Sequence, residues 1–273
     1  MIIDGHAHAC GDFLTSENII KKLDESGVDK VVLVPGEIGS SKNYSIPNLA
    51  KIFPSKNVVK VTNYLTKFVI KITGATKQIP KGNEFVYDLT NKTNGRVIQF
   101  IWITRQIESP VEYLNKKFVD WKFKGVKLHQ CWESYSINSE FFRNIAEWSE
   151  KNDVPMFIHL YSDSDVKEII EYKKKHRNLK LIIAHLFGIE LFIKDDFKDG
   201  NLYFDSSTLQ ITSTKRLMKT IRFVGAGNVT MGTDTPYGKE NLEKNINRIK
   251  GLNISKEEKD QILGGNMKAL LKL

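Results

Sequence analysis

Strand-like apolar runs alternate with amphipathic helical patterns along the chain, and this alternation limits the folds that are open to it. The runs are short and apolar on both faces, as in Val28 to Pro35 (VDKVVLVP). Strands of this kind, separated by helices, are typical of a parallel sheet covered by helices. Eight such runs occur, at 1–8, 28–35, 96–103, 123–129, 154–160, 179–186, 201–205 and 228–232.

Between the runs, apolar residues recur at intervals of three and four, the period of an amphipathic helix. The predicted helices span 16–26, 110–122, 139–151, 163–176, 188–197 and 214–223. A terminal helix is predicted at 255–271, with Ser255 and Glu258 as a capping box and an interruption at Gly264-Gly265.

Eight strand–helix units predict an α/β fold, a closed (β/α)8 barrel of the TIM type. The 273 residues fit one such domain, 1–273. An open doubly wound sheet is the alternative. It would need a glycine-rich phosphate turn after an early strand, and His6-Ala7-His8-Ala9-Cys10-Gly11 is no such turn.

The segment Glu37 to Gly95 interrupts the strand–helix alternation, because it is far longer than one barrel helix requires. It carries nine lysines against Glu37, Glu84 and Asp88. Leu65 to Ile72 is apolar enough to pack, so we expect an ordered insertion with helices. Loops that follow strands lie on the catalytic face of a barrel, and this insertion is therefore predicted to form a lid over the site.

Charge and cysteine content narrow the functional class. The net charge is +9, but the excess is mostly lysine spread over many helices, so nucleic-acid binding is not expected.

The chain has no apolar run long enough for a membrane span and no signal-peptide pattern. Cys10 and Cys131 are too few for a disulfide framework. We expect a cytoplasmic protein that acts on a small molecule. The sequence does not decide whether it forms a homo-oligomer.

Ligand-type side chains stand at the ends of five predicted strands. In Asp4-Gly5-His6-Ala7-His8 alternate residues share a strand face, so Asp4, His6 and His8 should point the same way and the two imidazoles form a chelating pair. The carboxyl ends of all barrel strands meet at one mouth, where these residues are expected to converge. The later strands end in Lys127 and His129, in His159, in His185 and in Asp234.

These motifs resemble the amidohydrolase superfamily, in particular its branch of metal-dependent hydrolases and decarboxylases. The resemblance spans nearly the whole chain except the insertion. It implies a divalent metal, usually zinc, that activates water, with His6, His8, His159 and Asp234 as ligands. The matching segments are Asp4-Gly5-His6-Ala7-His8, Gly125-Val126-Lys127-Leu128-His129, Phe157-Ile158-His159, Ala184-His185 and Gly232-Thr233-Asp234, with a looser echo in Ile262-Leu263-Gly264-Gly265-Asn266.

The chemistry of these residue types agrees with that ligand set. Zinc binds imidazole nitrogen and carboxylate oxygen at about 2.0 to 2.2 Å, and a catalytic zinc keeps one position for water. Asp234 can contact both metal and water, accept a proton and pass it to the leaving group. His185 is expected to donate to the substrate oxygen where negative charge develops. Asp234 and His185 are therefore the predicted catalytic residues.

Two roles are open for Lys127. In binuclear members of the superfamily a carbamylated lysine at this point bridges two metals, and Lys127 and His185 would then be ligands of a second ion. Otherwise a protonated Lys127 binds a substrate carboxylate. We favour one ion, Zn²⁺ or another divalent metal, because many members of this branch keep this lysine with a single metal. His129, Arg105 and Trp132 are the other predicted substrate-binding residues.

The expected activity is hydrolysis of an amide, ester or lactone bond in a small, carboxylate-bearing molecule by a zinc-activated water. The alternative is a zinc-dependent, non-oxidative decarboxylase of an aromatic or unsaturated acid, which would use the same ligands. A metal-binding barrel without catalysis is the third candidate. It is disfavoured because a structural zinc site is closed by four protein ligands and needs no general base.

Overall fold

A computed structural model describes residues 1–55, 57–238 and 240–273; Lys56, one of the nine lysines of the long segment, lies outside these ranges. Within them the strands form one eight-stranded sheet in the order of the sequence, and all neighbouring strands are parallel. The strands are β1 (Ile3–His8), β2 (Lys30–Val34), β3 (Val97–Trp102), β4 (Gly125–His129), β5 (Met156–His159), β6 (Leu181–Ile183), β7 (Leu202–Asp205) and β8 (Val229–Thr230).

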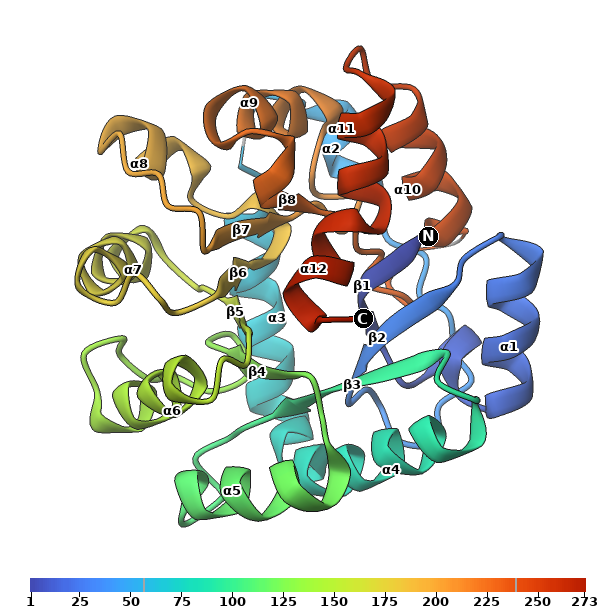
Figure 1. Cartoon of the computed structure of the whole chain (residues 1–273), viewed down its shortest axis with the longest axis vertical. Helices are drawn as coiled ribbons and strands as arrows, with labels where there is room; N and C mark the ends of the chain where they lie inside the picture. Colours follow the sequence, from blue (N-terminus) through green and yellow to red (C-terminus); the bar gives the residue numbers. More distant parts are fainter. Residues whose placement is uncertain (56, 239) are drawn as a thin grey trace.

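The sheet curls until its last strand reaches its first. The amide of Gly5 donates to the carbonyl of Met231 at 2.9 Å, and the amide of His8 donates to the carbonyl of Thr235 at 2.8 Å. Gly5 permits this approach, since a Cβ atom there would lie 2.8 Å from the Met231 carbonyl oxygen. The strands therefore form a nearly closed barrel, and the predicted TIM-type fold is confirmed (Figure 1).

Helices surround the barrel because each has one apolar face to bury. Most connect consecutive strands on the outside, while α12 covers one end of the barrel and α3 lies across the other (Figure 1). The helices are α1 (Ser16–Glu25), α2 (Leu49–Ile52), α3 (Val59–Thr73), α4 (Ile79–Lys92), α5 (Pro110–Trp121), α6 (Glu140–Lys151), α7 (Asp163–Lys175), α8 (Ile189–Lys194), α9 (Thr214–Val224), α10 (Asn241–Lys250), α11 (Lys256–Asp260) and α12 (Asn266–Leu271).

Several elements differ from their predicted bounds. The predicted strand 179–186 is strand only over Leu181–Ile183, because the chain turns at His185, whose φ of 57° lies in the left-handed region. Helix α10 was not predicted. The terminal helix is interrupted at Gln261–Gly265 as expected, and Ser255 and Glu258 form the predicted capping box.

The long segment between β2 and β3 is helical, as predicted, and contains α2, α3 and α4. Helix α4 buries Ile79, Val86 and Leu89 against the barrel, in the place of an ordinary barrel helix. Helix α3 buries only Val59 and Asn63. Among the described residues no helix is long and apolar enough to cross a membrane.

Candidate metal centre

Five predicted site residues converge at the carboxyl ends of the strands. His6 and His8 end β1, His159 ends β5, His185 lies in the turn after β6, and Asp234 follows β8. One nitrogen of His6, one of His8 and one carboxylate oxygen of Asp234 lie within 4.8 Å of one another. Segments more than two hundred residues apart are brought together here because β1 and β8 are neighbours in the closed barrel.

The hydrogen bonds of His8 identify which of its nitrogens faces the centre. Its Nδ1 lies 2.7 Å from the carbonyl oxygen of Pro35, and a carbonyl can only accept, so Nδ1 carries the hydrogen. Nε2 lies 3.2 Å from Oδ1 of Asp234, and in a neutral imidazole this nitrogen carries no hydrogen. A nitrogen lone pair and a carboxylate oxygen repel each other at this distance, so either a proton or a metal cation lies between them.

The same reasoning applies to His6. Ser207 donates its hydroxyl hydrogen to Asp205, so its Oγ accepts from His6 Nδ1 at 3.0 Å. The Nε2 atom of His6 is left as a second bare nitrogen, 3.5 Å from Oδ1 of Asp234. In each of these two histidines Nδ1 donates to an oxygen acceptor, the Pro35 carbonyl for His8 and the Ser207 hydroxyl for His6. Such hydrogen bonds orient imidazoles that bind metals.

His185 and His159 form a second facing pair. His185 donates from Nδ1 to the carbonyl of Ser207 at 2.7 Å. Asn63 donates from Nδ2 to the carbonyls of Leu160 and Tyr161, so its Oδ1 must accept from His159 Nε2, at 2.7 Å. The remaining nitrogens, His185 Nε2 and His159 Nδ1, lie 3.1 Å apart, and a neutral His185 would present a lone pair to the lone pair of His159. The two lone pairs need a cation or a proton between them.

The charge states of these groups also suit a metal. Burial lowers the pKa of His6 and of His159 well below the ordinary value, which keeps both imidazoles neutral, as ligands must be. Burial alone would raise the pKa of Asp234, but the neighbouring histidines, His6 above all, lower it below its ordinary value. The site therefore offers two imidazoles held neutral by burial, the further imidazoles of His8 and His185, and one carboxylate.

The spacing of the donor atoms fits a divalent cation. Ligand atoms about 2.1 Å from zinc in a tetrahedron are roughly 3.4 Å apart. The Oδ1 atom of Asp234 is 3.2 Å from one imidazole nitrogen and 3.5 Å from another, those of His8 and His6. His159 joins the cluster through His185, whose Nε2 is 3.9 Å from Oδ2 of Asp234. The residues present are therefore suited to hold a divalent metal.

Lys127 is fully buried beside this cluster. Its Nζ lies 3.0 Å from Nε2 of His6 and 4.0 Å from the centre of the Phe157 ring. Burial lowers its pKa to about 7, the direction that carbamylation requires. Both roles predicted for this lysine, substrate binding and bridging of a second metal, remain compatible with its position.

A cavity of about 310 Å³ opens directly on these groups. His129 and Trp132 line it as predicted for substrate-binding residues, and Tyr237 adds a further aromatic wall. The ring of His129 stacks between two other rings: its centre lies 3.9 Å from the centre of the His159 ring and 5.6 Å from that of the Trp102 ring. Much of the remaining wall is apolar and comes from the long segment: Ile46, Leu65, Val69 and Ile70. We call this space the histidine cavity.

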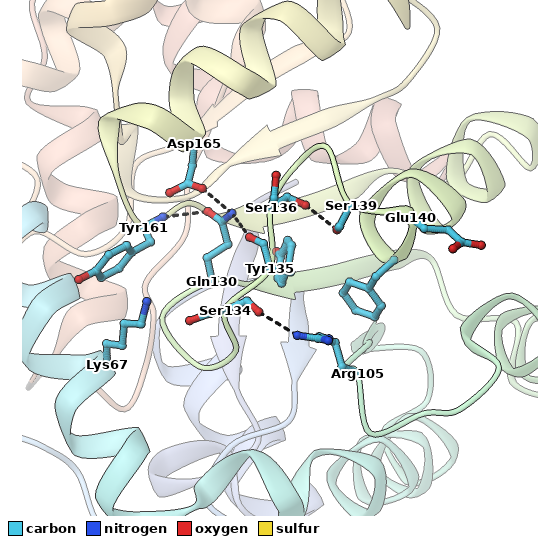
Figure 2. A pocket seen from close by; sticks show the side chains of 11 residues that line it. Lys67, Arg105, Gln130, Ser134, Tyr135, Ser136, Ser139, Glu140, Tyr161 and Asp165 are labelled. Carbon is cyan, nitrogen blue, oxygen red and sulfur yellow. Dashed lines mark hydrogen bonds between the residues drawn. The ribbon is translucent and has the colours of Figure 1, made fainter.

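One predicted site residue does not lie where the sequence suggested. Arg105 is not part of the histidine cavity; it lines a separate hollow of about 680 Å³, where its guanidinium donates to the carbonyl of Ser134 (Figure 2). Asp4 shares β1 with the two histidines, but its carboxylate accepts from the amide and the hydroxyl of Thr233. Asp4 therefore ties β1 to the segment after β8.

Asn63 and Ser207 are site residues that the sequence reasoning missed. Asn63 stands in the unrecognised long segment, and a lone amide among the apolar residues of 58–72 was the only available signal. Ser207 follows β7, the one late strand to which no site residue was assigned, although it ends in the polar run Asp205-Ser206-Ser207. Between them these residues orient three of the four histidines.

Comparison with known proteins agrees with the sequence resemblance. Residues 67–273 match the sequence model of a family described as Amidohydrolase. No match was found among curated proteins.

Several solved structures share the fold at low sequence identity. A 2,6-dihydroxybenzoate decarboxylase from Rhizobium has 15% identity and a TM-score of 0.72, over 99% of this chain and 98% of that chain. A dihydroxybenzoic acid decarboxylase from Polaromonas, with bound manganese and the inhibitor 2-nitroresorcinol, has 15% identity and a TM-score of 0.65, over 100% and 97%. A probable 2-pyrone-4,6-dicarboxylic acid hydrolase from Acinetobacter baumannii has 13% identity and a TM-score of 0.66, over 100% and 99%.

Proposed function

The chain belongs to the amidohydrolase family, and from this premise we propose that it is a metal-dependent, non-oxidative decarboxylase of a small aromatic or unsaturated acid. The observation that carries the proposal is the histidine cavity, in which four histidines and Asp234 form one end and apolar or aromatic side chains line much of the remaining wall. Its volume of about 310 Å³ suits a substrate with one ring.

In this proposal His6, His8, His159 and Asp234 hold the metal, with zinc as the first candidate and manganese as the second. When bound, the metal supplies a positive charge that orients the substrate oxygens and stabilises negative charge on them. Lys127 lies beside His6 and binds the substrate carboxylate. His129 and Trp132 pack against the ring.

The apolar wall gives decarboxylation its driving force. A carboxylate that enters the cavity loses its hydration, and its conversion into neutral carbon dioxide removes a poorly solvated charge. The bond between the ring carbon and the carboxylate breaks, the electron pair stays on the ring carbon, and a proton takes the place of carbon dioxide. The ionised Asp234 would take this proton from a substrate hydroxyl group or from water and deliver it to the ring carbon, with His185, 3.9 Å away, as a relay.

Hydrolysis of an ester, lactone or amide is the second candidate. It is favoured by one observation: the carboxylate of Asp234 stays ionised, with its pKa below the ordinary value, so it can accept a proton from water. Once that proton passes to Nε2 of His185, this histidine would donate to the oxygen on which charge develops. The probable 2-pyrone-4,6-dicarboxylic acid hydrolase among the similar structures is named for a reaction of this class.

We further propose that 37–95 acts as a lid, since its side chains line the histidine cavity. Its nine lysines give it a positive field that would attract carboxylate-bearing substrates. Arg105 lines a separate hollow. Its positive charge would add to this field, and it would not contact the substrate directly.

The test uses protein that is stripped with chelator and reloaded with zinc or manganese. It is incubated in D₂O with dihydroxybenzoates and with 2-pyrone-4,6-dicarboxylate. Release of carbon dioxide, with one deuterium on the carbon that carried it, is the expected result. Lactone opening without carbon dioxide would favour the hydrolase. Stoichiometric metal with no turnover of either class would contradict both candidates.

A further inference from the structure

Helix α3 carries its apolar face on the outside of the molecule. Its inner face is formed by Val59 and Asn63, with Thr62 and Thr66 half-buried beside them. A surface helix ordinarily does the opposite and turns its apolar stripe to the core. The outward side chains are 52 to 70% exposed; we call Val61, Tyr64, Leu65, Phe68, Val69 and Ile72 the α3 face.

The α3 face is as large as the largest apolar patches found on monomers. With about 150 to 200 Å² for each complete side chain, its exposed fractions leave on the order of 600 Å² of surface that is mostly apolar. The largest apolar patch on a typical monomer is about 300 to 600 Å². Two such faces packed together would bury roughly 1,200 Å², the lower limit of a stable protein interface, before any neighbouring residue is counted.

The spacing within the face is that of a helix–helix seam. Val61, Leu65, Phe68 and Ile72 follow one another at intervals of four, three and four residues. This is the a/d repeat with which one helix packs its side chains between those of another. A helix of the same kind is the partner that such a stripe fits, and α3 itself is one.

We propose that a second copy of this chain covers the α3 face and that the protein is a dimer held by α3 against α3. A membrane surface fits less well, because two of the lysines that flank the face, Lys60 and Lys67, point back to their own chain. Lys60 pairs with Asp163 at 2.5 Å, and Nζ of Lys67 lies 4.0 Å from the centre of the Tyr161 ring. Lysines that bind a lipid surface would instead extend toward the headgroups.

The dimer would also complete the histidine cavity. Leu65 and Val69 line this cavity, yet they are 55% and 52% exposed. A second copy on the α3 face covers the outer surface of these two residues. The wall of the cavity is then shielded from solvent and α3 is held in place.

The first test compares the mass of the wild-type protein in solution with that of Phe68→Glu/Ile72→Glu. Sedimentation velocity at micromolar concentration is expected to give twice the mass of the chain for the wild type. The double variant should raise the dimer Kd on the order of 100-fold or more, since charges replace apolar side chains at the centre of the seam. Val119→Glu is the matched control, because Val119 is 74% exposed on α5, away from the α3 face. A monomeric wild type, or equal loss of dimer in the control, overturns the proposal.

The second test uses engineered cysteines. The native Cys10 and Cys131 are both buried, so an oxidant acts on the introduced thiol. Leu65→Cys, Phe68→Cys and Ile72→Cys should yield at least one cross-linked dimer, and Val119→Cys none. Flotation with vesicles that contain anionic lipid is run in parallel. Monomers that bind these vesicles through the α3 face, without cross-linking, would overturn the proposal in favour of a membrane surface.

Discussion

Replacement of Asn63 by alanine tests how the long segment supports the metal centre. Asn63 is 1% exposed, and its side chain makes three hydrogen bonds: it donates to the carbonyls of Leu160 and Tyr161 at 2.9 and 3.0 Å and accepts from His159 at 2.7 Å. Each such bond contributes about 1 kcal/mol net, so Asn63→Ala should lower the free energy of unfolding by about 3 kcal/mol. A urea titration measures this loss.

The effect on metal affinity separates a positioning role from a purely structural one. Asn63 holds the hydrogen of His159 on Nε2 and leaves Nδ1 bare. Loss of a group that orients a ligating histidine typically costs 10- to 100-fold in affinity, so competition with a chromophoric chelator should show weaker zinc binding by about that factor. In metal-free wild type, ¹⁵N shifts of the His159 ring should report a protonated Nε2.

Asn83→Ala is the matched control. Asn83 is also a buried asparagine of the long segment, and its side chain makes two hydrogen bonds to the main chain of Trp102, both at 2.8 Å. It should therefore lose about 2 kcal/mol of stability without weakening metal binding. The reasoning would be refuted if Asn63→Ala bound zinc within twofold of wild type, or if His159 were protonated on Nδ1.

Three further outcomes are expected at the centre and its entrance. His6→Ala and His8→Ala should each lose the metal, as measured by elemental analysis after gel filtration; a full equivalent retained in both would exclude them as ligands. Asp234→Asn should keep most of the metal but lower turnover by about 10²- to 10⁴-fold, because an amide cannot accept the proton; near-normal rates with full metal occupancy would assign proton transfer to another group. For a carboxylate substrate, kcat/KM should fall as ionic strength rises from about 0.01 to 0.15 M and the screening length shrinks from about 30 to 8 Å; a flat profile would remove the electrostatic role of 37–95.

Local patterns were enough to predict the barrel and the convergence of its ligands. The apolar periods of strands and helices repeat over a few residues, because they reflect which face of each element is buried. They can therefore be recognised without knowing which other segment each element packs against. In a closed barrel all the strands present their carboxyl ends at one mouth. His6, His8, His159 and Asp234 were therefore predicted to meet from their places at strand ends, and the structure brings them together.

Contacts between distant segments decided the rest. Asn63 reaches His159 across 96 positions and Ser207 reaches His6 across 201, and no local pattern links such pairs. The bare nitrogens of the centre follow from these contacts, because an imidazole shows which nitrogen carries its hydrogen only through its partner. The direction of the α3 face is equally a tertiary result: the period of the helix marks an apolar stripe, and only packing determines whether that stripe meets the core or the solvent.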